Sequence, residues 1–98
     1  MTKKQARDLT ARTMHDVKIW TNECTACEHD YYRTKGALQE VTFMLWNATL
    51  AFGGSKIVKD AIKEIEDESD ILNIWWELVQ RDNLKLSYRA WKAKEEQR

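Results

Sequence analysis

The sequence predicts an all-α protein, a small bundle of three to five helices with a long N-terminal helix or helical hairpin. Three observations predict it. An apolar side chain recurs at every third or fourth position across residues 17–52, which is the spacing of one helix face. The 98 residues include no proline and only three glycines, so little interrupts helix formation. A composition that is 43% hydrophobic and 33% charged suits a single domain, residues 1–98, with one core.

The first helix begins with a capping box, in which Thr2 is the N-cap and Gln5 reaches back to it. It leads into an apolar stripe formed by Val17, Trp20, Cys24, Cys27, Tyr31, Thr34, Leu38, Val41, Leu45, Ala48 and Phe52. Residues 3–52 form either one rod, roughly 75 Å long at ~1.5 Å per residue, or two helices that turn near Gly36. An unbroken rod needs a supercoiling partner and exceeds the usual helix length. We therefore favour a turn or kink at Gly36.

The segment from Ala37 to Phe52 is apolar on nearly every side. A helix with so little polar surface is expected in the centre of a bundle or in an interface between subunits. The segment is too short to span a membrane. Gly53 and Gly54 supply its C-terminal exit.

Ser55 is the expected N-cap of the next helix. The acidic run 66–70 is expected to close that helix and to cap a further one that starts at Ile71. A bend or a turn is expected at residues 81–83. Leu84, Tyr88 and Trp91 form a last apolar row.

Charge is unevenly distributed although the formal net charge is zero. Residues 1–18 carry five basic and two acidic side chains, and residues 81–98 carry six basic and three acidic, so each end sums to +3. Between them, residues 19–54 sum to −2 and residues 55–80 to −4. Basic ends around an acidic middle predict pairing within one fold or between copies. The neutral total argues against bulk, non-specific nucleic-acid binding.

No set of side chains predicts catalysis or a cofactor. Cys24 and Cys27 are expected on one helix face as packed thiols. A zinc site would need two further donors, but His15 and His29 fall away from that face. We therefore expect no metal, no cofactor and no enzymatic activity.

The C-terminal helix is the best candidate for a binding surface. Basic side chains recur along one expected arc of it, with two aromatic residues nearby, and neighbouring tryptophans upstream point about 100° apart, so that one is free to be a surface anchor. The predicted partner-binding residues are Arg81, Lys85, Tyr88, Arg89, Trp91, Lys92 and Trp76. Alternatively this arc is merely solvated, with Trp91 in the core, or it pairs with the acidic middle of the chain.

The resulting functional hypothesis is a small cytoplasmic protein that binds another protein, and also itself as a homodimer or larger assembly. It would act as a stoichiometric regulator or inhibitor. Small accessory proteins of phages and mobile elements, including inhibitors of host defence, share this format by analogy only. The alternative is a nucleic-acid or nucleotide binder that uses the basic, aromatic C-terminal helix. Neither a signal peptide nor a membrane segment is expected.

Overall fold

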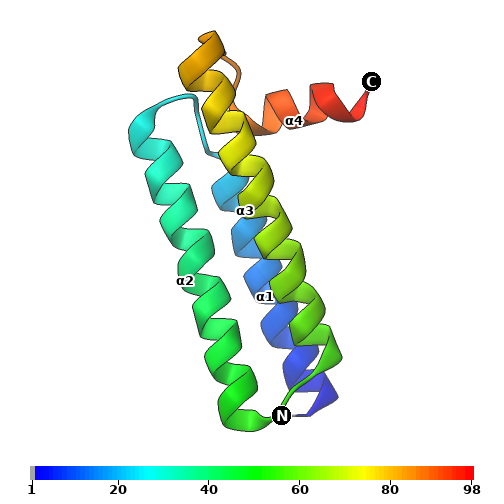
Figure 1. Ribbon diagram of the computed structural model, residues 1–98. Helices are drawn as coiled ribbons and strands as arrows, with labels where there is room; N and C mark the ends of the chain where they lie inside the picture. The colour runs from blue at the N-terminus through cyan, green and yellow to red at the C-terminus, as the bar shows by residue number, and fades with distance from the viewer. Residues whose placement is uncertain (1) are drawn as a thin grey trace.

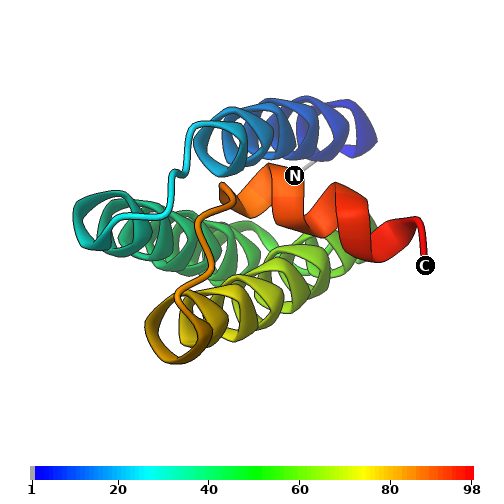
Figure 2. The ribbon, with the colours of Figure 1, turned by 90° about the horizontal axis from the view of Figure 1, so that it is seen from above.

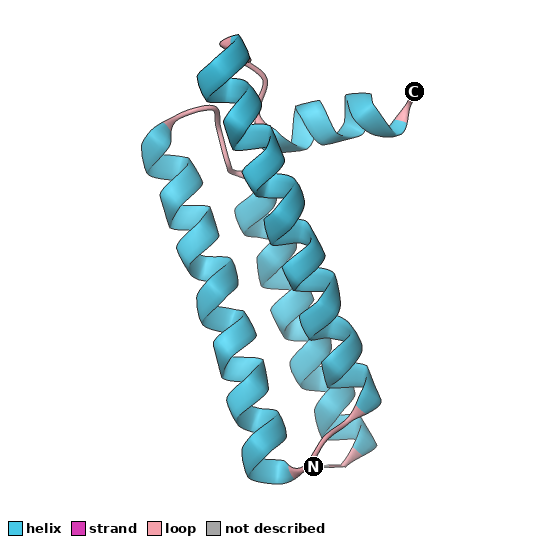
Figure 3. Cartoon of the chain, viewed as in Figure 1, coloured by secondary structure: helices cyan, strands magenta, loops and turns pink. Residues whose placement is uncertain are grey.

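The protein consists of four α-helices and, within the described residues, no strand. The computed structural model describes residues 2–98, apart from the side chain of Phe52. The helices are α1 (Lys3–Asn22), α2 (Glu28–Phe52), α3 (Lys56–Asp82) and α4 (Tyr88–Glu96). Figures 1 and 3 show α1, α2 and α3 running alongside one another as a three-helix bundle, with α4 crossing its upper end. The predicted all-α bundle with an N-terminal helical hairpin is confirmed.

The capping box predicted at the start of α1 is present. The Gln5 backbone N–H donates to the Thr2 hydroxyl at 3.1 Å, and the Thr2 backbone N–H donates to the Gln5 side-chain oxygen at 2.9 Å. These two bonds satisfy N–H groups that the first turn of a helix leaves without partners. Local sequence therefore fixes where the first helix begins.

The turn expected at Gly36 lies instead ten residues earlier. The chain leaves α1 after Asn22 and re-enters a helix at Glu28, with Cys27 as the N-cap of α2. The Thr25 backbone N–H donates to the Asp30 carboxylate at 3.1 Å, and the Asp30 N–H donates to the Cys27 sulfur at 3.5 Å. The second bond satisfies an N–H of the first turn of α2, and the first ties the connection to that turn. The Asp30 carboxylate places a negative charge at the N-terminus of α2, where the helix dipole favours one.

Two expectations from the sequence are therefore wrong: a break in the helix at Gly36, and a helix face shared by the two cysteines. Gly36 lies inside α2, in unbroken helix. Cys24 and Cys27 lie in the connection between helices and not on one helix face, with Cys24 buried and Cys27 exposed.

α3 also differs from expectation, because it runs through the acidic segment 66–70 without a break. Its buried positions keep helical spacing on both sides of that segment, from Ile65 to Leu72, so the core holds the helix together across it. Glu66, Asp67 and Asp70 are exposed to solvent, and Glu68 is partly buried and paired with Lys92, so none of them ends the helix. The end expected at residues 81–83 is confirmed: Asn83 is the C-cap, with a left-handed φ of 55°.

The junction between α2 and α3 follows the sequence closely. Gly53 has a φ of 85°, which favours glycine, and Ser55 is the N-cap of α3 although its side chain makes no capping hydrogen bond. The turn returns α3 antiparallel to α2.

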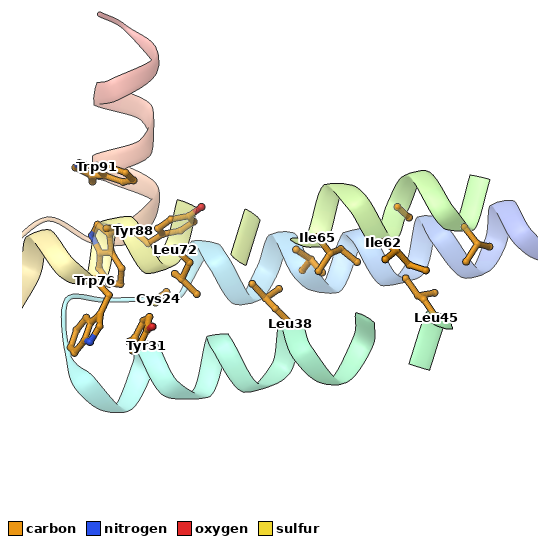
Figure 4. Packing of buried hydrophobic residues seen from close by; sticks show 14 of the residues in the cluster. Cys24, Tyr31, Leu38, Leu45, Ile62, Ile65, Leu72, Trp76, Tyr88 and Trp91 are labelled. Carbon is orange, nitrogen blue, oxygen red and sulfur yellow. The ribbon is translucent and has the colours of Figure 1, made fainter. Parts of the chain in front are cut away.

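The core lies where α1, α2 and α3 face one another, and it is richest in aromatic residues under α4. Figure 4 shows Leu38 and Leu45 of α2 directed toward Ile62 and Ile65 of α3. At the other end, Tyr31 and Trp76 stack with ring centroids 4.5 Å apart and planes 6° from parallel. The buried residues are Ala6, Thr13, Val17, Thr21, Cys24, Tyr31, Thr34, Leu38, Leu45, Val58, Ala61, Ile62, Ile65, Leu72, Trp75, Trp76, Tyr88 and Trp91.

Candidate functional site

The outward face of α2 carries the exposed apolar surface that distinguishes this bundle. Figure 2 shows α1 and α3 packed on one side of α2, with α4 across the bundle from it. Contacts of α4 run to α1 and α3 and not to α2. The outward face of α2 is therefore uncovered by the remainder of the chain.

Large apolar side chains stand on this face. The exposed fractions are 55% for Tyr32, 68% for Phe43, 43% for Trp46 and 81% for Leu50. Phe43, Trp46 and Leu50 are neighbours on this face, and Tyr32 lies farther along it. Exposed apolar patches larger than a few hundred Å² are rare on monomeric proteins unless they bind something.

These residues have the spacing of a second helix-packing seam. Together with two further exposed residues they recur at intervals of four, three, four, three and four. The outer seam is Tyr32, Gly36, Gln39, Phe43, Trp46 and Leu50. Alternating intervals of three and four residues mark a helix that packs along another helix. The inner seam, through Tyr31, Leu38 and Leu45, is buried, so α2 has one seam inside the bundle and one outside it.

This arrangement corrects the interpretation of residues 37–52. The segment does not form the centre of the bundle, because Phe43, Met44, Trp46 and Leu50 are exposed. Its apolar residues divide between two faces about 100° or more apart around the helix, of which only the inner face packs within the chain. The other part of that prediction, an interface between subunits, stays a prediction.

Gly36 leaves a gap in the outer seam. A Cβ placed at this residue would have no atom within 4 Å, so nothing inside the chain requires glycine there. Glycine within a helix costs about 0.5–1 kcal/mol relative to alanine. The monomer thus carries a destabilising residue for which its own packing gives no reason.

Charge on α2 is confined to its first half. Residues 28–40 hold Glu28, Asp30, Arg33, Lys35 and Glu40, whereas residues 41–54 hold no charged side chain. One end of the outer seam is therefore bordered by charges of both signs and the other end by none.

A shallow groove borders the outer seam where α2 meets α1. It encloses about 460 Å³, and Trp20 of α1 and Met44 of α2 contribute apolar walls. Glu40 and Asn47 add polar groups at its rim. The groove widens the apolar surface toward α1.

The structure disperses the predicted C-terminal site. Arg81 lies in the last turn of α3, Lys85 lies in the connection, and Arg89 and Lys92 lie on α4. The expectation that the four form one helical arc is wrong, because the left-handed Asn83 ends α3 between them.

The aromatic members of that predicted site are core residues. Tyr88 is fully buried, and Trp91 and Trp76 are 9% and 8% exposed. The expectation that one of the neighbouring tryptophans is exposed is wrong, because Trp75 and Trp76 are both buried. Figure 4 shows Trp76 beside Tyr31, and Tyr88 and Trp91 at the α4 crossing. No exposed aromatic ring of α4 remains available for stacking or anchoring.

Arg89 and Lys92 pair with the acidic middle of the chain. The Lys92 ammonium lies 2.6 Å from one Glu68 carboxylate oxygen, and the Arg89 guanidinium lies 3.8 Å from the other. Arg89 also donates to the Asn22 side chain at 2.8 Å and to the Thr21 hydroxyl at 2.7 Å. The alternative that the C-terminal cations pair within the fold is the arrangement observed.

The Tyr88 ring lies beside this ion cluster, with the Arg89 guanidinium and the Lys92 ammonium each 6.0 Å from its centroid. Its hydroxyl is buried and has no hydrogen-bond partner among the described residues. Burial, followed by the nearby Glu68 carboxylate, raises the pKa of Tyr88 far above its usual value. Both causes disfavour the charged phenolate. Beside the cluster, a cavity of about 320 Å³ between α1, α3 and α4 is lined by Lys18 and Glu64 as well as by the paired residues.

The side chains considered for zinc do not converge. Cys24 is buried in the connection, Cys27 caps α2, and His15 and His29 are exposed on α1 and α2. Within residues 2–98, no group of three or more His, Cys, Asp or Glu side chains is placed to hold a metal ion. Burial raises the pKa of the Cys24 thiol, which makes it less reactive.

No protein-family model matches this sequence, and neither a curated protein nor a solved structure is significantly similar to the chain. No helix among the described residues combines the length and the hydrophobicity needed to cross a membrane. The function therefore has to be argued from the surface of the protein itself.

Sequence reasoning missed the outer seam of α2 as a site. The spacing of the outer seam is visible in the sequence. The inner seam has the same spacing within the same segment, displaced by one residue. The two together look like a segment that is apolar all round. Separating them requires knowing which face α1 and α3 cover.

Proposed function

We propose that this protein is a non-enzymatic binding protein whose outer α2 seam packs against an amphipathic helix of a polypeptide partner. The observation that carries the proposal is the exposed outer seam of α2, in which Phe43, Trp46 and Leu50 keep the three-and-four spacing of helix packing while no helix of the chain covers them. A partner helix with the same spacing would extend the bundle by one layer. Such a protein acts by occupancy, as a stoichiometric regulator or inhibitor does.

Several features of the seam suit binding. Aromatic residues dominate binding energy at protein interfaces, and Phe43 and Trp46 stand at the centre of the exposed face. The groove beside Met44 gives a partner side chain a recess to enter. The second half of α2 has no charge to desolvate when a partner covers it.

The nucleic-acid alternative receives no comparable support. Arg89 and Lys92 are engaged with Glu68, and Tyr88 and Trp91 are buried, so the combination of free cations and exposed rings that would hold a strand is not present on α4. Arg81 and Lys85 remain exposed near the α3–α4 connection, and their part in binding a protein stays a prediction.

Site-specific photocrosslinking tests the proposal. A photoreactive phenylalanine analogue replaces Phe43 in the full chain, and a matched protein carries it at Lys63, which is 79% exposed on α3. On irradiation in the cells that produce the protein, we expect one or a few adducts of defined mass from position 43 and none from position 63. Fragmentation of the adduct should place the link in a helical segment of the partner. Absence of adducts at position 43, or equal labelling at both positions, would contradict the proposal.

A further inference from the structure

We propose that the helix occupying the outer seam is α2 of a second copy, packed antiparallel so that Trp46 of each copy fills the gap at Gly36 of the other. This inference rests on the proposed function and names the partner of the same surface. The order of residues along the seam selects this register, and the distribution of charge and the exposed area are compatible with it.

The seam is complementary to itself when it is reversed. If a second α2 is turned antiparallel about a point midway between Gln39 and Phe43, these two residues face each other across the pair. In the same register Gly36 faces Trp46, and Tyr32 faces Leu50. Each pairing occurs twice by symmetry, and no seam position is left without a counterpart. A two-fold axis of this kind is the commonest arrangement of homodimers.

The register places the largest side chain against the smallest. Trp46 is 43% exposed, and a Cβ on Gly36 would meet no atom within 4 Å apart from its chain neighbours and the backbone of its own helix. In helix packing, a side chain of one helix inserts into a hole between side chains of the other. Gly36 provides such a hole, which accounts for a glycine that the monomer's own packing does not explain.

Charge does not oppose antiparallel pairing. In the antiparallel register, residues 28–40 lie along residues 42–54 of the second copy, which carry no charge. A parallel pair would place Lys35 beside Glu40 of the second copy, because these two residues flank the seam five positions apart, so charge alone does not exclude it. The order of side chains disfavours it, since Trp46 would face Trp46 and the gap at Gly36 would face another gap.

The exposed area matches what a modest dimer requires. A fully exposed aromatic side chain presents ~150–250 Å², so the exposed parts of Tyr32, Phe43, Trp46 and Leu50 leave roughly 450 Å² of largely apolar surface on each copy. Two copies remove about twice that area, and flanking residues such as Met44 raise the total to the lower range of specific interfaces, ~1,200 Å².

The first experiment measures mass and its dependence on the seam. We expect light scattering of the full chain at micromolar concentration to give twice the 11.6 kDa monomer mass. Phe43→Glu buries a carboxylate in the pair and should give a monomer with an unchanged circular dichroism spectrum. Ile74→Glu is the matched control, since Ile74 is 53% exposed on α3, and it should remain dimeric. A wild-type protein that is monomeric at 100 µM would overturn the inference.

Gly36→Leu distinguishes a glycine that makes room for Trp46 of a second copy from a glycine that matters only within the monomer. In the monomeric Phe43→Glu background, Gly36→Leu should raise the thermal midpoint, because a helix former replaces glycine where there is open space. In the wild-type background it should weaken dimerisation at least tenfold, because the leucine fills the space that Trp46 needs. An equal or stronger dimer in the Gly36→Leu protein would contradict the register.

Disulfide trapping tests the direction of the helices. Tyr32→Cys and Leu50→Cys are made separately in a Cys27→Ser background and then mixed and oxidised. The antiparallel register predicts a cross-linked product only from the mixture, because two copies of position 32 lie 18 residues apart along the pair, about 27 Å at ~1.5 Å per residue. A product from Tyr32→Cys alone would indicate parallel pairing and overturn the proposal.

The crosslinking at position 43 separates the two proposals. An adduct of twice the monomer mass supports both. An adduct with a different protein, together with a monomeric wild-type chain, would leave the binding function in place and overturn self-pairing. No adduct at all would overturn both.

Discussion

Lys92 of α4 and Glu68 in the middle of α3 form an ion pair of 2.6 Å in which both side chains are mostly covered, with 19% and 15% of their surfaces exposed. The pair joins the basic C-terminus to the acidic middle of the chain and fixes where α4 crosses the bundle. Most other ion pairs of the described residues are local and more exposed, as is Lys56–Asp60, which joins neighbouring turns of α3. The charge segregation seen in the sequence thus has a use inside the fold.

Lys92→Met should destabilise the protein. It leaves the Glu68 carboxylate largely buried, with the Arg89 guanidinium 3.8 Å away as its remaining cation. We expect the free energy of unfolding to fall by about 1–3 kcal/mol. Urea denaturation followed by circular dichroism measures it. Lys56→Met is the matched control and should change stability by less than about 0.5 kcal/mol, because its ion pair is solvated. Equal effects of the two changes would show that the Lys92 pair contributes no more than a surface pair.

Tyr88 should make the protein less stable in alkali. Burial and the nearby Glu68 carboxylate raise the pKa of Tyr88 in the folded state above its value of 10.0 in the unfolded chain. The folded state therefore holds the phenolic proton more tightly. The contribution of Tyr88 to the free energy of unfolding is fully present below pH 10 and declines as the pH rises above it, because the Tyr88 phenol ionises readily there only in the unfolded chain.

Tyr88→Phe isolates this effect. The hydroxyl has no hydrogen-bond partner among the described residues, so its removal should alter stability at pH 7 by less than about 1 kcal/mol. Between pH 9 and 11, the thermal midpoint should fall less steeply for Tyr88→Phe than for the wild type. Parallel pH profiles for the two proteins would show that Tyr88 ionises freely in the folded state.

Much of the fold could be predicted because burial follows the residue pattern. Leu38 and Leu45 lie at core positions that the apolar stripe selects, and the capping box at Thr2 appears as expected. The break between α1 and α2 was not predictable from spacing. Cys24 is buried from within the connection and so continues the stripe while the chain is not helical. The bonds that stabilise the break, from Thr25 to Asp30, join residues five positions apart that no propensity scale identifies.

The candidate site was less predictable for a physical reason. Arg81 and Arg89 have the spacing of one helix face, but that spacing has meaning only if the helix continues, and Asn83 ends it. A tryptophan such as Trp76 occurs both in cores and at binding surfaces, so its identity does not predict its burial. Trp76 is buried because it stacks on Tyr31, a residue from a distant part of the chain. Which face of a helix remains uncovered depends on the packing of all the helices together.

Trp76 should behave as a core residue in mutagenesis. It stacks on Tyr31 at 4.5 Å and is 8% exposed. Trp76→Ala should therefore lower the free energy of unfolding by about 3–5 kcal/mol. Trp76→Phe keeps an aromatic ring against Tyr31 and should cost clearly less. Chemical denaturation monitored at several wavelengths provides the measurement. A Trp76→Ala protein as stable as the wild type would place Trp76 at the surface, as a binding anchor.

The two cysteines should respond oppositely to serine. Cys27 is exposed and its sulfur accepts a hydrogen bond from the Asp30 N–H at 3.5 Å, as the N-cap of α2. Serine is among the best N-cap residues, so Cys27→Ser should leave stability unchanged or raise it slightly. Cys24 is fully buried, and Cys24→Ser replaces its thiol with a more strongly hydrated hydroxyl, at a cost of about 1–3 kcal/mol where that hydroxyl is not fully hydrogen-bonded.

Thiol labelling with Ellman's reagent distinguishes the two residues without mutation. The native protein should release one equivalent of chromophore rapidly, from Cys27, and the second only in denaturant. Cys24 is shielded from the reagent, and burial raises the pKa of its thiol, so little thiolate is present to react. Rapid release of two equivalents from the native protein would mean that the α1–α2 connection opens. The thiols would then be open to solvent, and Cys24→Ser would cost little stability.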